Sequence, residues 1–240
     1  MSEWLDRHST PGYGAVYNAS LGSGYWGAHW ENLERPALVK ELKRCRSQGA
    51  STLLDLACGT GRVLSAAQEV FALSVGADAS SAMLALAAKE HRRLVLCDSA
   101  ALAFRNAFDV ITAFRFMLNA SDDLRLNTLR SIRAVLRDPG WFISNVHVNA
   151  HGPSGVAYRA YNQVNRAKTF RTLSVRQYEA ILSQSGFFVE RTIWLGALPR
   201  TVKALDRPAA RLLLPVERMA RRFRVPPEWS QSFMVVSRPI

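Results

Sequence analysis

The hydrophobic pattern of this chain alternates between short apolar runs and longer segments with helical spacing. Alternation of this kind predicts an α/β fold, in which a sheet is covered by helices. The predicted strands are 53–56, 72–76, 94–97, 108–114, 141–148, 187–194 and 232–237. The predicted helices include 34–48, 174–184 and one that starts at Ser121 and ends at Asp138.

Two segments depart from this alternation because glycine interrupts them. Residues 1–34 contain five glycines among many aromatic side chains, and we expect neither a linker nor a regular helix there. Residues 149–173 hold Gly152, Pro153 and Gly155 together with several polar residues, which predicts a loop.

The insertion at 197–230 combines an apolar stripe with a basic one. Its apolar stripe is Leu212, Val216, Met219 and Phe223, and the adjoining stripe is Arg207, Arg211, Arg218 and Arg222. Pro215 interrupts the pattern, so two short helices are an alternative to one. Such a segment can cover a substrate pocket with its apolar face inward, which is the simpler hypothesis, or lie on an anionic bilayer.

The run Leu53 to Gly61 carries the strongest functional signal. Ala57 to Gly61 form a turn with almost no side-chain bulk between a buried strand and a helix, so the backbone can approach a ligand closely. Later strands end at Asp78 and Asp98, and an acid about 20 residues beyond a glycine turn can accept hydrogen bonds from ribose hydroxyls. We therefore expect a nucleotide-like ligand at this edge of the sheet.

Four motifs in this order resemble those of the class I S-adenosylmethionine-dependent methyltransferases. DLACGTG is similar to their first motif, GADAS with Met83 to the second, CDSA to the third and FDVITAFRFMLN to the fourth. The resemblance covers about 35–195 and the last strand. It implies a Rossmann-like fold with a seven-stranded, mostly parallel sheet, an antiparallel last strand, helices on both faces, and S-adenosylmethionine as the cofactor.

The same resemblance implies a role for particular residues. Residues 1–34 would cover the cofactor and substrate, and 35–240 would form the methyltransferase domain. The implied cofactor contacts are Tyr17 and Trp26 from the cover; Asp55, Ala57, Gly59 and Gly61 at the amino acid part; Asp78 at the ribose; Ala79, Met83, Asp98 and Ser99 at the adenine; and Phe114 and Arg115 at the methionine part.

Other nucleotide sites fit the glycine turn less well. A dinucleotide fingerprint would place a third glycine or alanine where Leu64 stands, and no Walker lysine follows the turn. An RNA or DNA methyltransferase remains an alternative, although 113–116 reads Ala-Phe-Arg-Phe rather than the Asn/Asp-Pro-Pro-aromatic run of enzymes that act on base amino groups. A protein that binds the cofactor without catalysis is a second alternative.

Methyl transfer to a hydroxyl requires an aligned acceptor and a group that removes a proton. His147 is the first candidate for that base and His151 the second, since an imidazole titrates near neutrality. Asn119 and Asn145 are candidates for acceptor contacts, and we expect no metal site. The segments FRFMLNASDDLR and NVHVNAHG resemble a bacterial subgroup that acts in glycan or natural-product pathways, which implies O-methylation in a biosynthetic reaction.

Charge is distributed unevenly along the chain. Residues 1–100 carry ten basic and ten acidic side chains, whereas 101–196 carry twelve against six and 197–240 nine against three, out of a net charge of +12. This asymmetry points to an anionic partner, either nucleic acid, a membrane surface or an acidic small molecule, unless it serves solubility alone. We expect an acidic or lipid-linked acceptor, and 197–224 is the candidate for peripheral membrane contact. The three cysteines lack metal spacing, and neither a signal segment nor an apolar run of membrane-spanning length is present. We therefore expect a cytoplasmic protein, or one at the inner face of the membrane.

Overall fold

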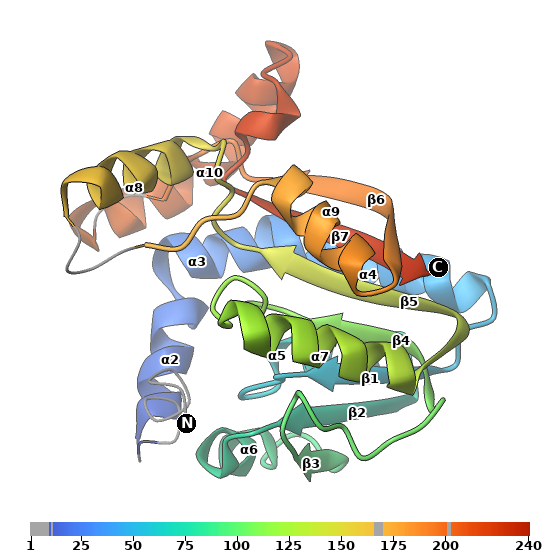
Figure 1. The fold of residues 1–240 in the computed structure, drawn as a ribbon. Coiled ribbons are helices and arrows are strands. Elements are labelled where there is room, and N and C mark those ends of the chain that lie inside the picture. The colour runs from blue at the N-terminus through green and yellow to red at the C-terminus, as the bar shows by residue number, and fades with distance from the viewer. Residues whose placement is uncertain (1–9, 11, 166–169, 201–202) are drawn as a thin grey trace.

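The fold is a seven-stranded sheet in the order β3-β2-β1-β4-β5-β7-β6, with helices on both faces (Figure 1). The computed structural model describes residues 10, 12–165, 170–200 and 203–240. β7 pairs antiparallel with both of its neighbours, and the other strand pairs are parallel. The strands are β1 (Thr52–Leu56), β2 (Leu73–Asp78), β3 (Leu94–Leu96), β4 (Phe108–Ala113), β5 (Leu136–Val146), β6 (Phe187–Leu195) and β7 (Ser232–Pro239).

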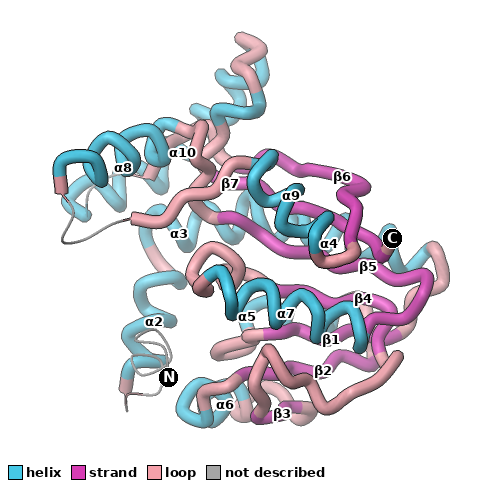
Figure 2. The backbone as a smooth tube through the Cα atoms, in the orientation of Figure 1, coloured by secondary structure: helices cyan, strands magenta, loops and turns pink. Residues whose placement is uncertain are grey.

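Two helical layers enclose this sheet, as the tube in Figure 2 shows. The α-helices are α2 (Tyr13–Gly22), α3 (Gly24–His29), α4 (Arg35–Ser47), α5 (Arg62–Gln68), α6 (Ser81–Ala87), α7 (Asp122–Val135), α8 (Pro153–Val164), α9 (Val175–Gln184) and α10 (Asp206–Arg222). A π-helical turn, Trp30–Glu34, joins α3 to α4.

Strand alternation divides the core between the two faces. Leu53 packs with Leu38 and Leu42 of α4, whereas its neighbour Leu54 packs with Leu129 of α7 on the opposite face. This period of two, with every residue of β1 buried, is typical of a central parallel strand. The arrangement brings the carboxyl ends of β1, β2, β4 and β5 to one edge, where ligands bind in open α/β sheets.

Side-chain caps fix the start of two helices as the sequence predicts. The Ser121 hydroxyl accepts a hydrogen bond from the Leu124 N–H at the start of α7. At α9, Ser174 and Gln177 form a reciprocal capping box. These two helices cover the face of the sheet toward which Leu54 points.

The structure corrects four expectations about secondary structure. Residues 13–34 form α2, α3 and the π-helical turn, interrupted at Ser23, and are not irregular. The segment expected to be a loop contains α8, and β5 begins at Leu136 rather than at Trp141. The 197–230 insertion holds one continuous helix, α10, with Pro215 inside it.

The apolar stripe of α10 does not face inward. Ala209 and Leu213 make the buried contacts of this helix, whereas Leu212, Met219 and Phe223 are exposed. The hypothesis of an apolar stripe folded over a pocket is therefore wrong in this structure. The buried side of α10, formed by Ala209 and Leu213, lies next to this stripe around the helix axis.

Candidate functional site

The turn after β1 has the backbone conformation that a close ligand approach needs. Gly59 and Gly61 have φ values of 56° and 92°, and Ala57 also lies in the left-handed region at 54°. A Cβ atom added at Gly59 would meet no atom within 4 Å. The space beside this glycine is therefore open to a ligand.

Asp78 ties the end of β2 to this turn. Its Oδ2 accepts a hydrogen bond of 2.8 Å from the Gly59 N–H, and its Oδ1 accepts one of 2.8 Å from the Ser80 N–H. Two backbone donors hold the carboxylate, so its orientation at the strand end is fixed. An acid held in this way is prepared to accept hydrogen bonds from ribose hydroxyls.

Asp55 presents an unpaired carboxylate oxygen at the same edge. Its Oδ1 accepts a hydrogen bond of 2.8 Å from the Thr112 hydroxyl, and its buried Oδ2 has no hydrogen-bond partner among the described residues. Burial raises the pKa of Asp55 to about 7, although the Thr112 hydrogen bond lowers it. This group can thus receive a cationic ligand such as an ammonium.

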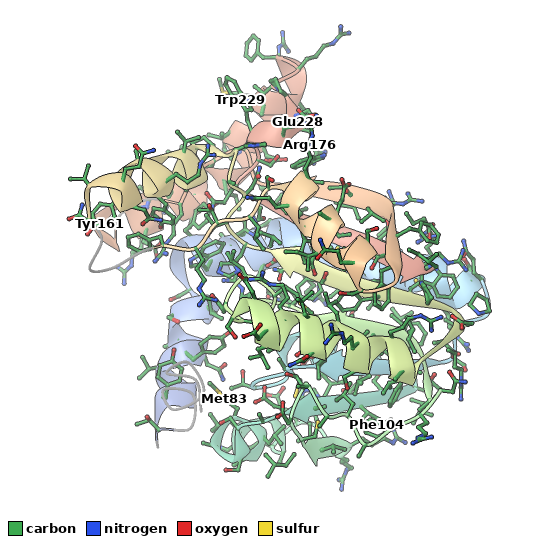
Figure 3. All side chains as sticks on the ribbon, viewed as in Figure 1. Met83, Phe104, Tyr161, Arg176, Glu228 and Trp229 are labelled. Atoms are coloured by element: carbon green, nitrogen blue, oxygen red, sulfur yellow. The ribbon has the colours of Figure 1, made fainter. Side chains whose placement is uncertain are left out.

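Helix α2 covers the turn from the solvent side. The Thr60 hydroxyl donates a hydrogen bond of 2.5 Å to Asn18, and Gly14 faces Leu86 of α6 so closely that an added Cβ would lie 2.4 Å from it. Met83 lies on α6 below α2 (Figure 3). Burial raises the pKa of Tyr17, which lines the cavity beneath this helix.

Arg115 lies past the end of β4 and is held at several points. Its φ of 57° is unusual for a side chain other than glycine. Its N–H donates to Asn145 Oδ1 at 2.6 Å, its carbonyl accepts from Asn119 Nδ2 at 2.6 Å, and its guanidinium lies 4.4 Å from the Trp26 ring centroid. The Nε and Nη2 atoms are buried without a hydrogen-bond partner among the described residues. The guanidinium therefore has donors available for a ligand.

Glu34, at the end of the π-helical turn, balances this charge. Its Oε2 lies 3.6 Å from Arg115 Nη2 and 3.9 Å from His29 Nδ1, and Asn145 donates to its Oε1. The carboxylate is 1% exposed. Burial raises its pKa, but Arg115 and His29 outweigh burial, so the pKa is lower than usual and the group is ionised. π-helical turns occur often at functional sites, and this one carries a buried carboxylate to the acceptor side of the sheet.

His147 lies beside this ion pair. Its ring packs edge-on against Trp26 at 6.3 Å, and its buried Nδ1 has no hydrogen-bond partner among the described residues. Burial, then the charge of Arg115, lowers the pKa of His147 to about 3, whereas Glu34 opposes the shift. The imidazole is neutral at pH 7 and can accept a hydrogen bond or a proton.

Comparisons with known proteins relate this part of the chain to methyltransferases. The family described as a methyltransferase domain matches residues 53–140. A probable S-adenosylmethionine-dependent methyltransferase of Saccharomyces cerevisiae, CRG1, is 36% identical over 80 residues, which cover 31% of this chain and 27% of the yeast protein. Residues 53–140 therefore match a methyltransferase domain, and an 80-residue part of the chain is similar to a probable S-adenosylmethionine-dependent methyltransferase.

Solved structures agree with this methyltransferase domain in fold. Magnesium protoporphyrin IX methyltransferase of Synechocystis PCC 6803, with bound S-adenosylhomocysteine, has a TM-score of 0.68 and 13% identity, over 99% of this chain and 98% of that one. A Burkholderia thailandensis 1,6-didemethyltoxoflavin-N1-methyltransferase has a TM-score of 0.57 and 15% identity, over 95% and 88%. The class I methyltransferase architecture is thereby confirmed.

The methyltransferase cofactor fits the residues present at the glycine turn. The orphaned Asp55 oxygen suits the cofactor ammonium, Asp78 suits its ribose, and the open space at Gly59 admits its backbone contacts. The cofactor residues expected from the sequence that line the two adjoining cavities here are Tyr17, Asp55, Ala57, Gly59, Asp78, Met83, Phe114 and Arg115. The structure adds Cys58, Thr60, Arg62, Val63 and Phe116 to that lining. Of these, Cys58 and Thr60 lie within the glycine motif, and Arg62 and Val63 follow it directly. Their nearness to the motif in the sequence could therefore have predicted that they line the cavity.

Five expected cofactor residues do not line these two cavities: Trp26, Gly61, Ala79, Asp98 and Ser99. Trp26 packs against Arg115 and His147 instead, which puts it on the acceptor side. Asp98 is exposed and accepts from the Ala100 N–H, while Ser99 is buried against Thr128. Their roles toward adenine stay predictions.

The residues expected at the acceptor site also occupy different environments. His151 is exposed at the start of α8, away from the Glu34–Arg115 pair. Asn145 is fully buried and uses its amide to hold Arg115 and Glu34, so it orients other residues. Asn119 bonds to the Arg115 carbonyl. His29 and Glu34 were missed because their partners are distant in sequence. Among the described residues, no cluster of three or more His, Cys, Asp or Glu could hold a metal.

Proposed function

We propose that this protein transfers the methyl group of S-adenosylmethionine to a hydroxyl of a small molecule or glycan. The observation that carries the proposal is the cluster of His147, Glu34 and Arg115 at the cofactor cavity that Arg115 lines, in which His147 Nδ1 and Arg115 Nε are buried with no hydrogen-bond partner among the described residues. A small-molecule acceptor is supported by the substrates after which the Synechocystis and Burkholderia methyltransferases are named.

The cofactor, when bound, supplies an electrophilic methyl group on a sulfonium. His147 accepts the hydrogen bond of the acceptor hydroxyl through its unpaired Nδ1 and takes the proton as the oxygen is methylated. Its low pKa makes the imidazolium unfavourable, and the ionised Glu34 nearby is the group that offsets this cost. Arg115 orients an anionic or polar part of the acceptor with its free guanidinium donors.

The N-terminal segment 12–34 acts as the cover of this site in our proposal. Tyr17 lines both cofactor cavities, and Trp26 forms a wall between Arg115 and His147. Residues 1–9 and 11 of the expected cover lie outside the described residues.

An acidic or lipid-linked acceptor is the class that the charge favours. On the proposed acceptor side, Arg62 and Arg115 act on Glu34, and Arg115 and Arg200 act on His147. We place the protein in the cytoplasm or at the inner face of the membrane. The part of the chain that the structure describes contains no helix long and apolar enough to span a bilayer.

Transfer of a labelled methyl group into fractionated bacterial extracts tests the proposal. We expect an alkali-stable labelled product of low molecular weight, made by the wild type and not by Asp78→Ala. Label released by alkali would indicate a methyl ester, and label destroyed by ribonuclease or deoxyribonuclease would support the nucleic-acid alternative. Binding of S-adenosylhomocysteine without any transfer would support a non-catalytic protein.

A further inference from the structure

Helix α10 carries its C-terminal end away from the sheet layers. Its buried side chains, Ala209 and Leu213, pack toward the body, where the helix lies on α3. The segment between α10 and β7 projects from the molecule, and Glu228 and Trp229 lie on it (Figures 1 and 3). We call residues 218–229 the α10 tip.

Large apolar side chains are exposed on this tip. Met219 is 57% exposed, Phe223 68% and Trp229 59%. Val225 at the tip is exposed too, and Leu205 and Leu212 continue the exposure along the outer side of α10. Single exposed apolar residues are ordinary, but a group of them on one projection indicates an interaction surface.

The charges of the tip are mostly positive. It contains four arginines, Arg218, Arg221, Arg222 and Arg224, and one acid, Glu228. Arg221 lies 3.8 Å from Glu217, whose other oxygen accepts from the Ala197 N–H. Within the described parts of the chain, the other three arginines take part in no ion pair. Their charge is therefore available to an external partner.

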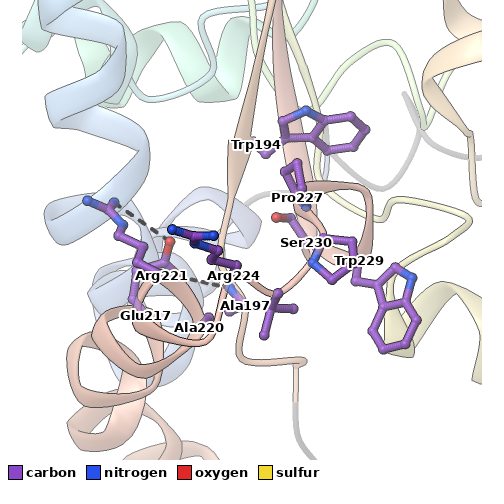
Figure 4. A pocket seen from close by; sticks show the side chains of 11 residues that line it. Trp194, Ala197, Glu217, Ala220, Arg221, Arg224, Pro227, Trp229 and Ser230 are labelled. Atoms are coloured by element: carbon purple, nitrogen blue, oxygen red, sulfur yellow. Dashed lines mark hydrogen bonds and ion pairs between the residues drawn. The ribbon is translucent and has the colours of Figure 1, made fainter.

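A groove lies at the base of the tip (Figure 4). Arg221 and Arg224 line one side, and Trp194, Pro227 and Trp229 line the other. A groove that joins guanidinium groups to indole rings suits a phosphate group attached to an apolar chain. Arg224, which lines the groove, directly follows the exposed Phe223 in the chain, so the basic and apolar parts of the tip adjoin.

We propose that the α10 tip binds the surface of an anionic phospholipid bilayer. Phe223, Met219 and Trp229 enter the boundary between headgroups and acyl chains, and the arginines contact the phosphates. The proposal extends the proposed function, because it holds the acceptor edge of the methyltransferase close to lipid-linked molecules.

The chemistry of the tip distinguishes this partner from two others. An RNA strand could use the arginines and indole rings of the groove, but it would leave the aliphatic side chains Met219 and Val225 exposed to water, because such side chains do not stack on bases. A second copy of the chain would bring the same arginines against one another across a two-fold axis, which is unfavourable. The anionic bilayer satisfies both the charge and the apolar exposure.

Sedimentation with vesicles of phosphatidylcholine, with and without phosphatidylglycerol, tests the proposal. We expect binding only to the vesicles with phosphatidylglycerol, weakened at high salt. Replacing Arg218, Arg222 and Arg224 together by Gln should weaken this binding by about 100-fold, since each arginine near an anionic surface contributes about fivefold. Phe223→Asp should weaken it at least tenfold.

Matched control variants distinguish an effect of the tip from the effect of removing any three exposed arginines or any exposed apolar side chain. Arg92 and Arg105 are exposed in the loops before and after β3, and Arg130 is exposed on α7, so their joint replacement by Gln removes the same charge. Ile240 is 75% exposed near the C-terminus, so Ile240→Asp is the control for Phe223→Asp. We expect both controls to sediment like the wild type.

Three outcomes would overturn the proposal: no sedimentation of the wild type, equal loss in tip and control variants, or binding to an RNA duplex or single strand in place of vesicles. Calorimetry with S-adenosylhomocysteine on the same variants keeps the two proposals apart. Wild-type protein that binds vesicles but no S-adenosylhomocysteine would refute the proposed function alone.

Discussion

Glu34 and Arg115 form a buried ion pair with 3.6 Å between the Oε2 and Nη2 atoms, at the edge of the sheet where β4 and β5 end. The two residues are brought together by a π-helical turn on one side and a left-handed backbone conformation on the other. Asn145 bonds to both, so the pair is fixed in orientation before any ligand binds. We regard it as the framework of the acceptor site.

Removing the charge of Glu34 should destabilise the protein. Glu34→Gln leaves the buried Arg115 without its counter-charge, and loss of one partner of a buried pair costs about 3 kcal/mol. Glu34 has a lowered pKa, so its contribution is complete at neutral pH and is lost as the pH falls through that lowered value. Urea unfolding at pH 7 measures the loss, and Arg115→Gln should cost much less in the Glu34→Gln background than alone. Additive costs in this double-mutant cycle would contradict the pairing.

Cofactor affinity should depend on pH through Asp55. Its pKa is raised to about 7, and the cofactor ammonium binds the ionised carboxylate, so each pH unit below about 7 should weaken S-adenosylhomocysteine binding about tenfold. Asp55→Asn should bind weakly with a flat profile. Calorimetry between pH 5 and 8 is the measurement. A wild-type profile that is flat across this range would refute the assignment.

A bulky residue at Gly59 should block the cofactor. Gly59→Val places a side chain in the open space beside the turn and strains a left-handed backbone, which costs about 1–2 kcal/mol. Gly186→Val is the control, because Gly186 also has a left-handed φ (79°) and open space but lies at the end of α9. Both variants should lose similar stability in urea unfolding, and only Gly59→Val should lose S-adenosylhomocysteine binding. Equal binding by both would show that the space at Gly59 is not used.

His147→Ala should lower turnover by roughly 10²- to 10⁴-fold, the usual contribution of a general base. Affinity for S-adenosylhomocysteine should change little, because His147 is absent from the lining of the cofactor cavities. Since its pKa is about 3, turnover should show no inflection from this histidine between pH 5 and 8. Turnover that survives in His147→Ala would exclude it as the base.

The sequence predicted the sheet well because strand burial leaves a simple pattern. Leu53 and Leu54 face opposite helical layers, and such alternation is visible without tertiary contacts. The N-terminal helices were missed because glycine disfavours helices. An added Cβ at Gly14 would lie less than 3 Å from Leu86 of α6, and one at Gly27 less than 3 Å from the Gly22 carbonyl carbon. Close packing therefore requires glycine here, the same residue type whose low helix propensity argued against a helix.

The helix α8 was missed for a related reason. Pro153 occupies the first turn, where its missing N–H costs nothing, and Gly155 lies against the Asn149 carbonyl. Within the candidate site, the glycine motif and Asp78 can be recognised from the local sequence alone. Glu34 gave none, because its partners Arg115 and Asn145 follow it by 81 and 111 residues, and only the fold brings them together.

The attachment of α2 has a consequence for the timing of the reaction cycle. This helix is connected to α3 through Gly22, Ser23 and Gly24, and the Asn18–Thr60 hydrogen bond and the Gly14 contact fasten it above the cofactor turn. If α2 covers the cofactor as we propose, spent cofactor leaves when these contacts open, and a fresh molecule is enclosed when they form again. We therefore expect the rate of exchange to depend on the glycines between α2 and α3, more than 20 residues before β1, in a segment separate from the residues proposed to carry out the chemistry.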